Sequence, residues 1–234
     1  MSKTHSPLKA LARTRVLKVQ SRGERIYSFS PKRTALLAID MQRDFFGEED
    51  DDDPMREIIP RVAELIALAR KMGCRVIHTR ECYASDLSDV TAYRKSLGYV
   101  GRDGPLGRFL VRGEAGCDFI DEVRPLTGET VIDKAGFSAF LGGELQRVLT
   151  GAKIDHLLLC GVTTQCCVHS TLREAVDLGY WCLTVADCCA AEDETLHDAA
   201  LLMIGGEGDL FGWIADLDDV ARAASGRAKR AAKK

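Results

Sequence analysis

The chain has 234 residues, of which 46% are hydrophobic and 29% charged, and this is enough to bury the core of one α/β domain. No apolar run reaches the roughly 18 residues that cross a membrane, and no secretory hydrophobic segment is present, so we expect a cytoplasmic protein without membrane contacts. The formal net charge is −3, but residues 1–23 and residues 220–234 each contain six basic side chains and no acidic ones. We interpret both ends as solvated arms and expect no nucleic-acid partner, although the N-terminal arm also has the Arg and Ser content of a transit peptide.

Strand-like and helix-like segments alternate along residues 31–224, which we take as a single domain between an N-terminal arm (1–30) and a C-terminal tail (225–234). Residues 81–127 contain scattered glycines without periodicity, so we expect a long excursion over the sheet edge. The other expected elements are, in chain order, a strand over 34–40, a helix over 54–72, strands over 74–79 and 129–134, a helix over 142–150, a strand over 155–160, a helix over 167–178, a strand over 180–186, and helices over 192–204 and 213–224. This alternation predicts a doubly wound three-layer α/β/α sandwich with a mainly parallel central sheet. The absence of a GxGxxG fingerprint after a strand argues against a dinucleotide cofactor.

The nine cysteines are odd in number and scattered through strand-like segments, which argues against a disulfide framework. Four of them form the adjacent pairs Cys166–Cys167 and Cys188–Cys189 near two expected strand ends. Adjacent cysteines lack the C-x-x-C spacing with which two thiolates bind one zinc ion. The acidic run over residues 48–53 is interpreted as a solvated loop, so we expect no metal.

Three expected strands lead into residues that are suited to acyl transfer. Asp40 ends the first strand, Lys134 ends the strand over 129–134, and Cys167 follows a turn at Gly161 and begins a helix. In an open parallel sheet all strands finish at one edge, so these three side chains can converge. Free N–H groups at a helix N-terminus favour a thiolate and can hold an oxyanion. Cys167 is therefore expected to ionise near neutral pH and to attack a carbonyl carbon.

The segments LLAIDMQRDFF, VIDKAGFSAF and GVTTQCCVHST resemble, in order, three motifs of the isochorismatase-like cysteine hydrolases, over roughly residues 33–212. The resemblance implies that Asp40 is the general base, Lys134 supports the oxyanion and Cys167 is the nucleophile. It also implies a cis peptide bond between Val162 and Thr163, and an oxyanion hole formed by the N–H groups of Thr163 and Cys167. Relatives are commonly dimers or tetramers, so we expect a homo-oligomer; no metal or organic cofactor is expected.

Flanking segments such as HTRECYASDL and GPLGRFLVRGEAG are similar to the biuret hydrolase and ureide amidohydrolase branch of the family. Where biuret hydrolases carry a glutamine, GGEGDLFG places Glu207, whose carboxylate suits a substrate with extra N–H donors or a cation. Phe46, Phe137, Arg80 and Glu81 are further candidates for substrate contact.

We therefore predict a cysteine-dependent amidohydrolase that cleaves a linear C–N amide or ureide bond of a small polar substrate, biuret-like or N-carbamoyl, through a thioester. Two alternatives stay open. One is a vinyl-ether hydrolase that acts on isochorismate, and the other is a non-catalytic binding or redox module that uses exposed thiols.

Overall fold

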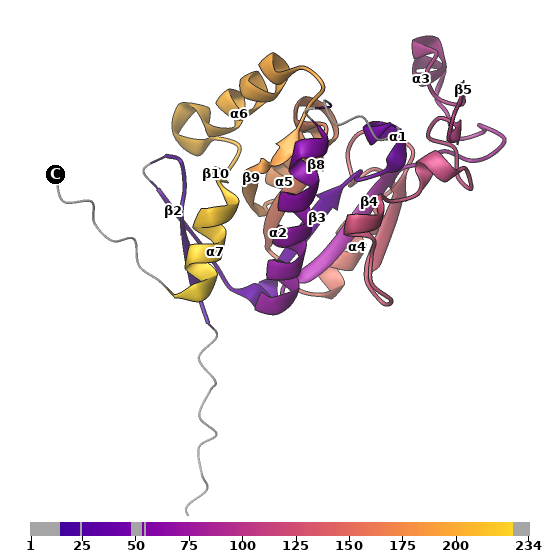
Figure 1. The fold of residues 1–234 in the computed structure, drawn as a ribbon. Coiled ribbons are helices and arrows are strands. Elements are labelled where there is room, and N and C mark those ends of the chain that lie inside the picture. Colours follow the sequence, from indigo (N-terminus) through magenta and orange to yellow (C-terminus); the bar gives the residue numbers. More distant parts are fainter. Residues whose placement is uncertain (1–14, 24, 48–52, 54, 227–234) are drawn as a thin grey trace, which may run out of the picture.

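Six parallel strands form the central sheet of the computed structural model, which describes residues 15–23, 25–47, 53 and 55–226 (Figure 1). Across the sheet their order is β10 (Trp213–Ala215), β9 (Trp181–Ala190), β8 (His156–Val162), β3 (Thr34–Ile39), β4 (Arg75–Glu81) and β7 (Thr130–Lys134). The chain enters this sheet at β3, adds β4 and β7 on one side, and returns to add β8, β9 and β10 on the other. This reversal creates a topological switch point between β3 and β8, where a ligand crevice forms at the carboxyl ends of the strands.

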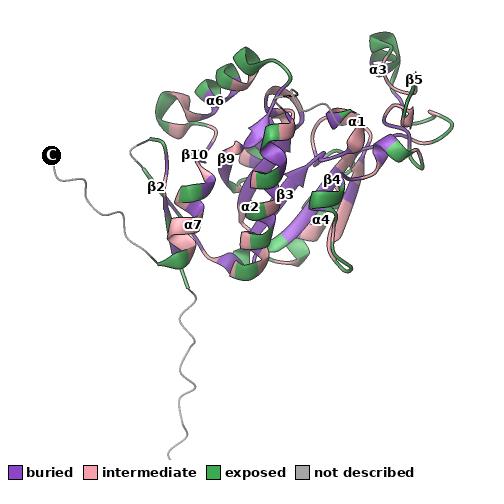
Figure 2. Ribbon diagram, viewed as in Figure 1, coloured by how far each residue is buried: buried purple, intermediate pink, exposed green. Residues whose placement is uncertain are grey.

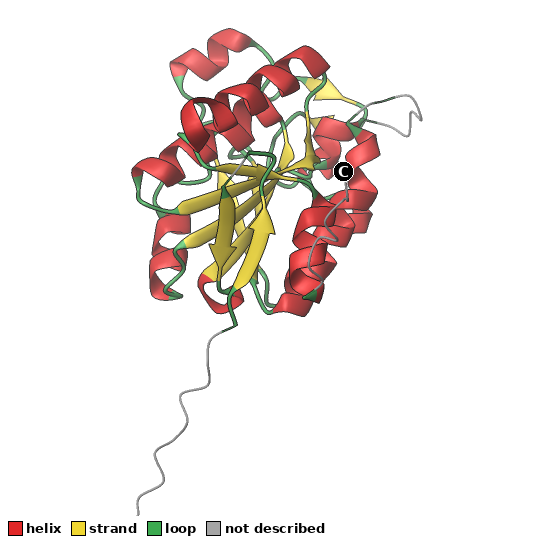
Figure 3. Ribbon diagram, turned by 90° about the vertical axis from the view of Figure 1, so that its left-hand side faces the viewer, coloured by secondary structure: helices red, strands yellow, loops and turns green. Residues whose placement is uncertain are grey.

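Helices cover both faces of the sheet (Figure 3). One face packs against α2 (Ile59–Met72) and α7 (Leu217–Ser225), and the other against α4 (Glu144–Gly151), α5 (His169–Asp177) and α6 (Glu194–Asp209). The strands lie buried between helices whose outer sides are exposed (Figure 2). Burial on both faces explains why β3 and β8 are continuous apolar runs rather than alternating ones. The predicted doubly wound α/β/α sandwich is confirmed, and no helix in the described ranges is long and apolar enough to cross a membrane.

The predicted N-terminal arm over residues 1–30 is wrong in its second half. β1 (Leu17–Gln20) and β2 (Ile26–Phe29) form an antiparallel hairpin. Alternate side chains of the hairpin, among them Val19, Tyr27 and Phe29, are buried in the core beside α2 and α7. The basic residues between them obscured this two-residue period. The remainder of the arm, residues 1–14, and residues 227–234 of the tail lie outside the described part of the chain.

At the C-terminal end, the single helix predicted over residues 213–224 is also wrong. The short edge strand β10 comes first, parallel to β9, and α7 begins only at Leu217. A strand of three residues is too short to show a period of its own, so the apolar residues of β10 are not distinguishable in the sequence from a first helical turn.

The excursion after β4 extends beyond the rest of the molecule in Figure 1. Its elements are α3 (Ala92–Leu97), β5 (Asp103–Gly104), β6 (Gly107–Arg108) and the turns η3 (Ala115–Cys117) and η4 (Asp121–Val123). Cys82 and Cys117, 35 residues apart in the chain, form a disulfide at the base of the excursion, with their Cα atoms 6.4 Å apart. The sequence, which argued only against a disulfide framework, did not predict this single bridge, because the fold brings together two thiols that no local spacing connects. Short segments complete the fold: η1 (Pro31–Arg33), α1 (Arg43–Phe46) and η2 (Arg56–Ile58).

Candidate active site

Asp40 lies directly after β3, at the switch point. Its φ of 52° is a left-handed conformation that few residues other than glycine adopt and that is concentrated at functional sites. The carboxylate is fully buried, and each of its oxygens accepts one hydrogen bond. Thr79 Oγ1 of the neighbouring β4 donates to Oδ1 at 2.6 Å, and Lys134 Nζ donates to Oδ2 at 2.6 Å. These two hydrogen bonds therefore fix the orientation of the carboxylate.

Lys134 ends β7, and its side chain crosses the end of β4 to reach Asp40. Its Nζ also donates to the carbonyl oxygen of Gly136 at 2.8 Å. Burial by itself would lower the pKa of Lys134, but the nearby Asp40 carboxylate and Cys167 outweigh it, so the pKa is raised. The amine is therefore an ammonium ion inside the protein.

A tight turn after β8 delivers Cys167 to the same edge. Gly161 has a φ of +114°, and a Cβ atom there would overlap the backbone of Ile39 in β3, so only glycine allows the two strands to approach this closely. The peptide bond between Val162 and Thr163 is cis. The π-helical turn η5 (Thr164–Val168) then carries Cys167 and continues into α5, so the helical segment begins three residues earlier than predicted.

The Cys167 thiol is buried, and its charge state differs from the expectation. A hydrogen bond with Cys166, burial and the negative charge of Asp40 together raise the pKa of Cys167 well above its ordinary value. This direction is opposite to the predicted ionisation near neutral pH, because these effects outweigh the Lys134 ammonium. A neutral thiol needs a base in order to attack.

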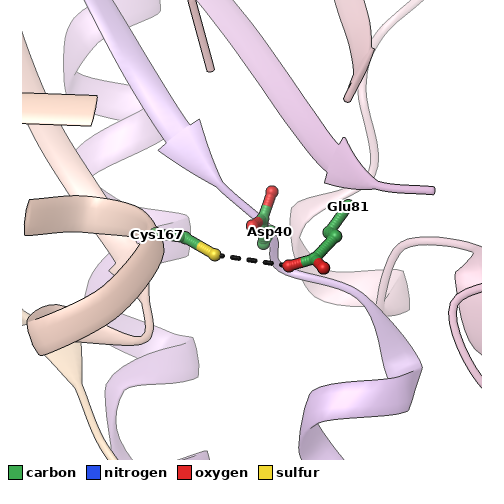
Figure 4. A group of neighbouring side chains, drawn as sticks. All are labelled: Asp40, Glu81 and Cys167. Atoms are coloured by element: carbon green, nitrogen blue, oxygen red, sulfur yellow. Dashed lines mark hydrogen bonds between the residues drawn. The ribbon is translucent and has the colours of Figure 1, made fainter. Parts of the chain in front are cut away.

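Figure 4 shows that Glu81, the last residue of β4, points toward the same thiol. Cys167 Sγ donates to Glu81 Oε2 at 3.5 Å, and ligand atoms of Asp40, Glu81 and Cys167 all lie within 4.8 Å of one another. Thr79 and Glu81 reach the site together because alternate residues of a strand share one face. This period places Thr79 beside the predicted Glu81, although the sequence analysis did not select Thr79.

Two residues of the excursion contact Glu81 and a third contacts one of these two; none of the three was predicted from the sequence. Arg94 of α3 forms a buried ion pair with Glu81 Oε1, and Tyr83 OH donates to the same oxygen at 3.0 Å. Arg94 Nε donates to Tyr83 OH at 2.8 Å, and its Nη1 donates to the hydroxyl of Tyr99. The guanidinium carbon of Arg94 lies 3.8 Å from the ring centroid of Phe137, a predicted substrate contact. No local pattern in an aperiodic segment indicates that an arginine will fold back to the sheet.

Two predicted substrate contacts lie away from this cluster. Arg80 points to the opposite face of β4 from Glu81, where its guanidinium pairs with Asp133 at 2.8 Å and lies over the ring of Phe119. Phe46 is buried in the core on the α2 side of the sheet, whereas Cys167 belongs to the core on the α5 side. Both predictions are therefore corrected. Arg80 and Glu81 are adjacent strand residues and so lie on opposite faces, and α1 packs Phe46 into the core on the α2 side.

Glu207 is also not at the site. The N-terminal end of α6 is near η5, where Thr164 Oγ1 lies 2.8 Å from His197 Nδ1. Its C-terminal end reaches the opposite, amino edge of the sheet, where Gly212 packs against the Cys182 carbonyl at the start of β9. Glu207 is exposed on that end, in a left-handed backbone conformation. The structure therefore does not place this carboxylate beside Asp40, Glu81 and Cys167.

Asp40, Glu81 and Cys167 are the group of possible metal ligands found among the described residues. Each of the two carboxylates already has a cationic partner, Lys134 for Asp40 and Arg94 for Glu81. An ammonium and a guanidinium this close oppose the binding of a further cation. The arrangement fits the activation of a thiol better than the binding of a metal.

Comparisons with known proteins show the family to which the chain belongs. The family model described as an isochorismatase domain matches residues 34–219. Over 218 residues the chain is 28% identical to the ureidoacrylate amidohydrolase RutB of Serratia proteamaculans, with 86% of each protein covered. An isochorismatase family protein from Desulfovibrio vulgaris superposes with a TM-score of 0.71 at 28% identity, covering 82% of this chain and 98% of the other. A cysteine hydrolase from Pseudomonas syringae superposes with a TM-score of 0.76 at 24% identity, covering 85% and 95%. The matched region includes the strands that lead to Asp40, Lys134 and Cys167, and the chain belongs to the isochorismatase family.

Proposed function

We propose that this protein is a cysteine-dependent amidohydrolase that cleaves a linear C–N bond of a small amide or ureide through a thioester. The observation that carries the proposal is the convergence of the Asp40 carboxylate, the Lys134 ammonium and the Cys167 thiol in one buried cluster at the switch point. A nucleophile, a base beside it and an ordering partner for that base are the parts that acyl transfer requires.

In the first half-reaction, the thiol proton of Cys167 passes to Asp40 while Sγ attacks the substrate carbonyl carbon. The oxyanion is held by the N–H groups of Thr163 and Cys167, and the Lys134 ammonium stabilises the added negative charge. The C–N bond then breaks, and the departing nitrogen takes the proton from Asp40. The products of this half-reaction are ammonia or an amine and a thioester on Cys167.

In the second half-reaction, water attacks the thioester carbonyl and transfers a proton to Asp40. The C–S bond breaks, the acid product leaves, and the proton returns to the sulfur. Because Asp40 accepts and releases one proton in each half-reaction, no external acid is needed. Lys134 stays protonated throughout, which fits its raised pKa.

One relative that the chain matches over most of its length is a ureidoacrylate amidohydrolase, and this supports a ureide as the substrate class. Cytoplasmic location and a homo-oligomeric state remain expectations that follow from the sequence and the resemblance.

The proposal is tested by ammonia release from biuret, triuret, ureidoacrylate, maleamate, nicotinamide and N-carbamoyl amino acids. With the best substrate, acid quenching during turnover and intact mass measurement should reveal an acyl adduct that maps to Cys167. Cys167→Ala and Cys167→Ser should lose both adduct and turnover. Wild-type rates in both variants would refute the covalent mechanism.

A further inference from the structure

The ion pair between Glu81 and Arg94 lies beside the nucleophile and out of contact with water. The two side chains are 3% and 5% exposed. A buried ion pair is stable only when further hydrogen bonds satisfy both of its groups, and removal of one partner leaves an uncompensated charge. Tyr83 and Tyr99 provide these bonds for Arg94, and the ring of Phe137 covers its flat face. The pair is therefore held in one orientation by its neighbours, unlike an exposed surface ion pair.

The two oxygens of Glu81 have different surroundings. Oε1 accepts from both Arg94 and Tyr83. For Oε2, the bond from the Cys167 thiol is the one hydrogen bond found within the described part of the chain. Arg94 therefore holds the carboxylate so that one acceptor oxygen faces the sulfur, and hence the position that the substrate carbonyl carbon takes when Sγ attacks.

A carboxylate in this position opposes the reaction unless a donor lies between it and the carbonyl group. An ionised carboxylate can only accept hydrogen bonds, and its negative charge repels the oxyanion that forms on attack. An N–H group on the substrate would satisfy Oε2, whereas an ether oxygen or a methylene group in the same place would leave it without a donor. Asp40 already serves the departing nitrogen, so the donor that remains is the nitrogen on the other side of the carbonyl.

We propose that Glu81 selects ureides, R–NH–CO–NH2, by accepting a hydrogen bond from the N–H that stays in the acyl group, and that Arg94 is the positioning residue that aims Glu81. This inference rests on the proposed amidohydrolase function. When the substrate binds, its N–H replaces the thiol as the donor to Oε2, and the thiol proton is then free to pass to Asp40. The contact persists in the thioester because the retained nitrogen stays beside Cys167.

The test compares a ureide with two analogues of equal length, in which oxygen (a carbamate) or CH2 (a simple amide) replaces the retained N–H. The wild-type enzyme should prefer the ureide. In Glu81→Gln, kcat/KM for the ureide should fall about 10- to 100-fold, the size expected for loss of a hydrogen bond to a charged group, while the analogues change by about threefold or less. The preference for the ureide should therefore collapse.

Arg94 is tested with Arg94→Met and Arg94→Lys, and Lys95→Met on the exposed side of the same helix is the matched control. Arg94→Met should lose the preference as Glu81→Gln does, Arg94→Lys should recover part of it, and Lys95→Met should behave as wild type. The recovery in Arg94→Lys is the readout that separates positioning of Glu81 from a purely structural role, because a lysine can still pair with the carboxylate.

An unchanged preference in Glu81→Gln, or equal losses on all three substrates, would overturn the role of Glu81. A normal preference in Arg94→Met, or no recovery in Arg94→Lys, would overturn the role of Arg94. Failure of the proposed function itself has a different signature, because Cys167→Ala would then retain turnover on every substrate.

Discussion

Replacing Lys134 by methionine removes a buried ammonium while keeping a side chain of similar length. Lys134 Nζ lies 2.6 Å from Asp40 Oδ2, and both side chains are 0% exposed. The substitution leaves a carboxylate in the interior whose remaining side-chain hydrogen bond, among the residues that the structure describes, comes from the Thr79 hydroxyl. Breaking a buried ion pair from one side costs about 3–5 kcal/mol. We therefore expect Lys134→Met to lose unfolding free energy of about this size, and to lose turnover because the site loses the ammonium that orders Asp40 and stabilises the oxyanion.

Guanidinium chloride unfolding at pH 7 of the wild type, Lys134→Met, Asp40→Asn and the double variant measures the coupling between the two groups. The double variant buries no unpaired charge, so it should be more stable than the additive expectation by about 2–4 kcal/mol. Lys71→Met, at an exposed position of α2, serves as the control and should change stability by about 0.5 kcal/mol or less.

The same pair predicts a pH dependence. Because the folded-state pKa of Lys134 is raised above 10.5, its stabilising contribution is complete below pH 10.5 and is lost as the pH rises through the folded-state value. Wild type and Lys134→Met should therefore converge in stability at strongly alkaline pH. Additive losses in the cycle, or a loss below about 1 kcal/mol in Lys134→Met, would refute the buried ion pair.

Three further predictions concern the scaffold. Glu129→Gln should lower stability at neutral pH and flatten the loss of stability between pH 4.5 and 2. Although burial opposes ionisation, hydrogen bonds lower the Glu129 pKa to about 2 from an ordinary 4.5, so the stabilisation from this carboxylate is present above pH 4.5 and is lost on acidification. Equal losses of stability in variant and wild type over this pH range would exclude this. Gly161→Ala should cost about 2–3 kcal/mol of unfolding free energy, because a Cβ there overlaps the backbone of Ile39; a loss within error of zero would contradict the close strand approach. Thiol titration of the denatured, unreduced protein should find seven free cysteines and rise to nine after reduction, whereas nine from the start would exclude the Cys82–Cys117 bridge.

Much of the catalytic arrangement could be predicted from the sequence because its parts are tied to strand ends. Asp40 and Lys134 each end a strand, and Cys167 follows one, so the parallel sheet alone brings them to one edge. The substrate contacts were less predictable. The side of a strand on which Arg80 or Glu81 lies depends on register, and a shift of one residue exchanges the two faces. Arg94 could not be found from sequence, because its segment has no period and its partner lies on another element.

Glu207 illustrates a different limit. Its place in the motif suggested a ligand contact, but α6 runs from the carboxyl edge of the sheet to the amino edge and carries this residue away from Cys167. The distance of a helix residue from the site cannot be found from sequence alone, since it depends on which end of the helix packs beside the site. The charge state of Cys167 has the same origin, because burial and neighbouring groups reverse what the helix N-terminus alone would do.

By itself, the sequence determined the layer architecture and the meeting of Asp40, Lys134 and Cys167 at one edge of the sheet, because hydrophobic period and strand ends are local properties of the chain. Only the tertiary structure decided that the free thiol is neutral, that Glu81 faces it through an ion pair with Arg94, and that Cys82 meets Cys117. These features depend on burial and on contacts between distant segments, and both arise only when the chain has folded.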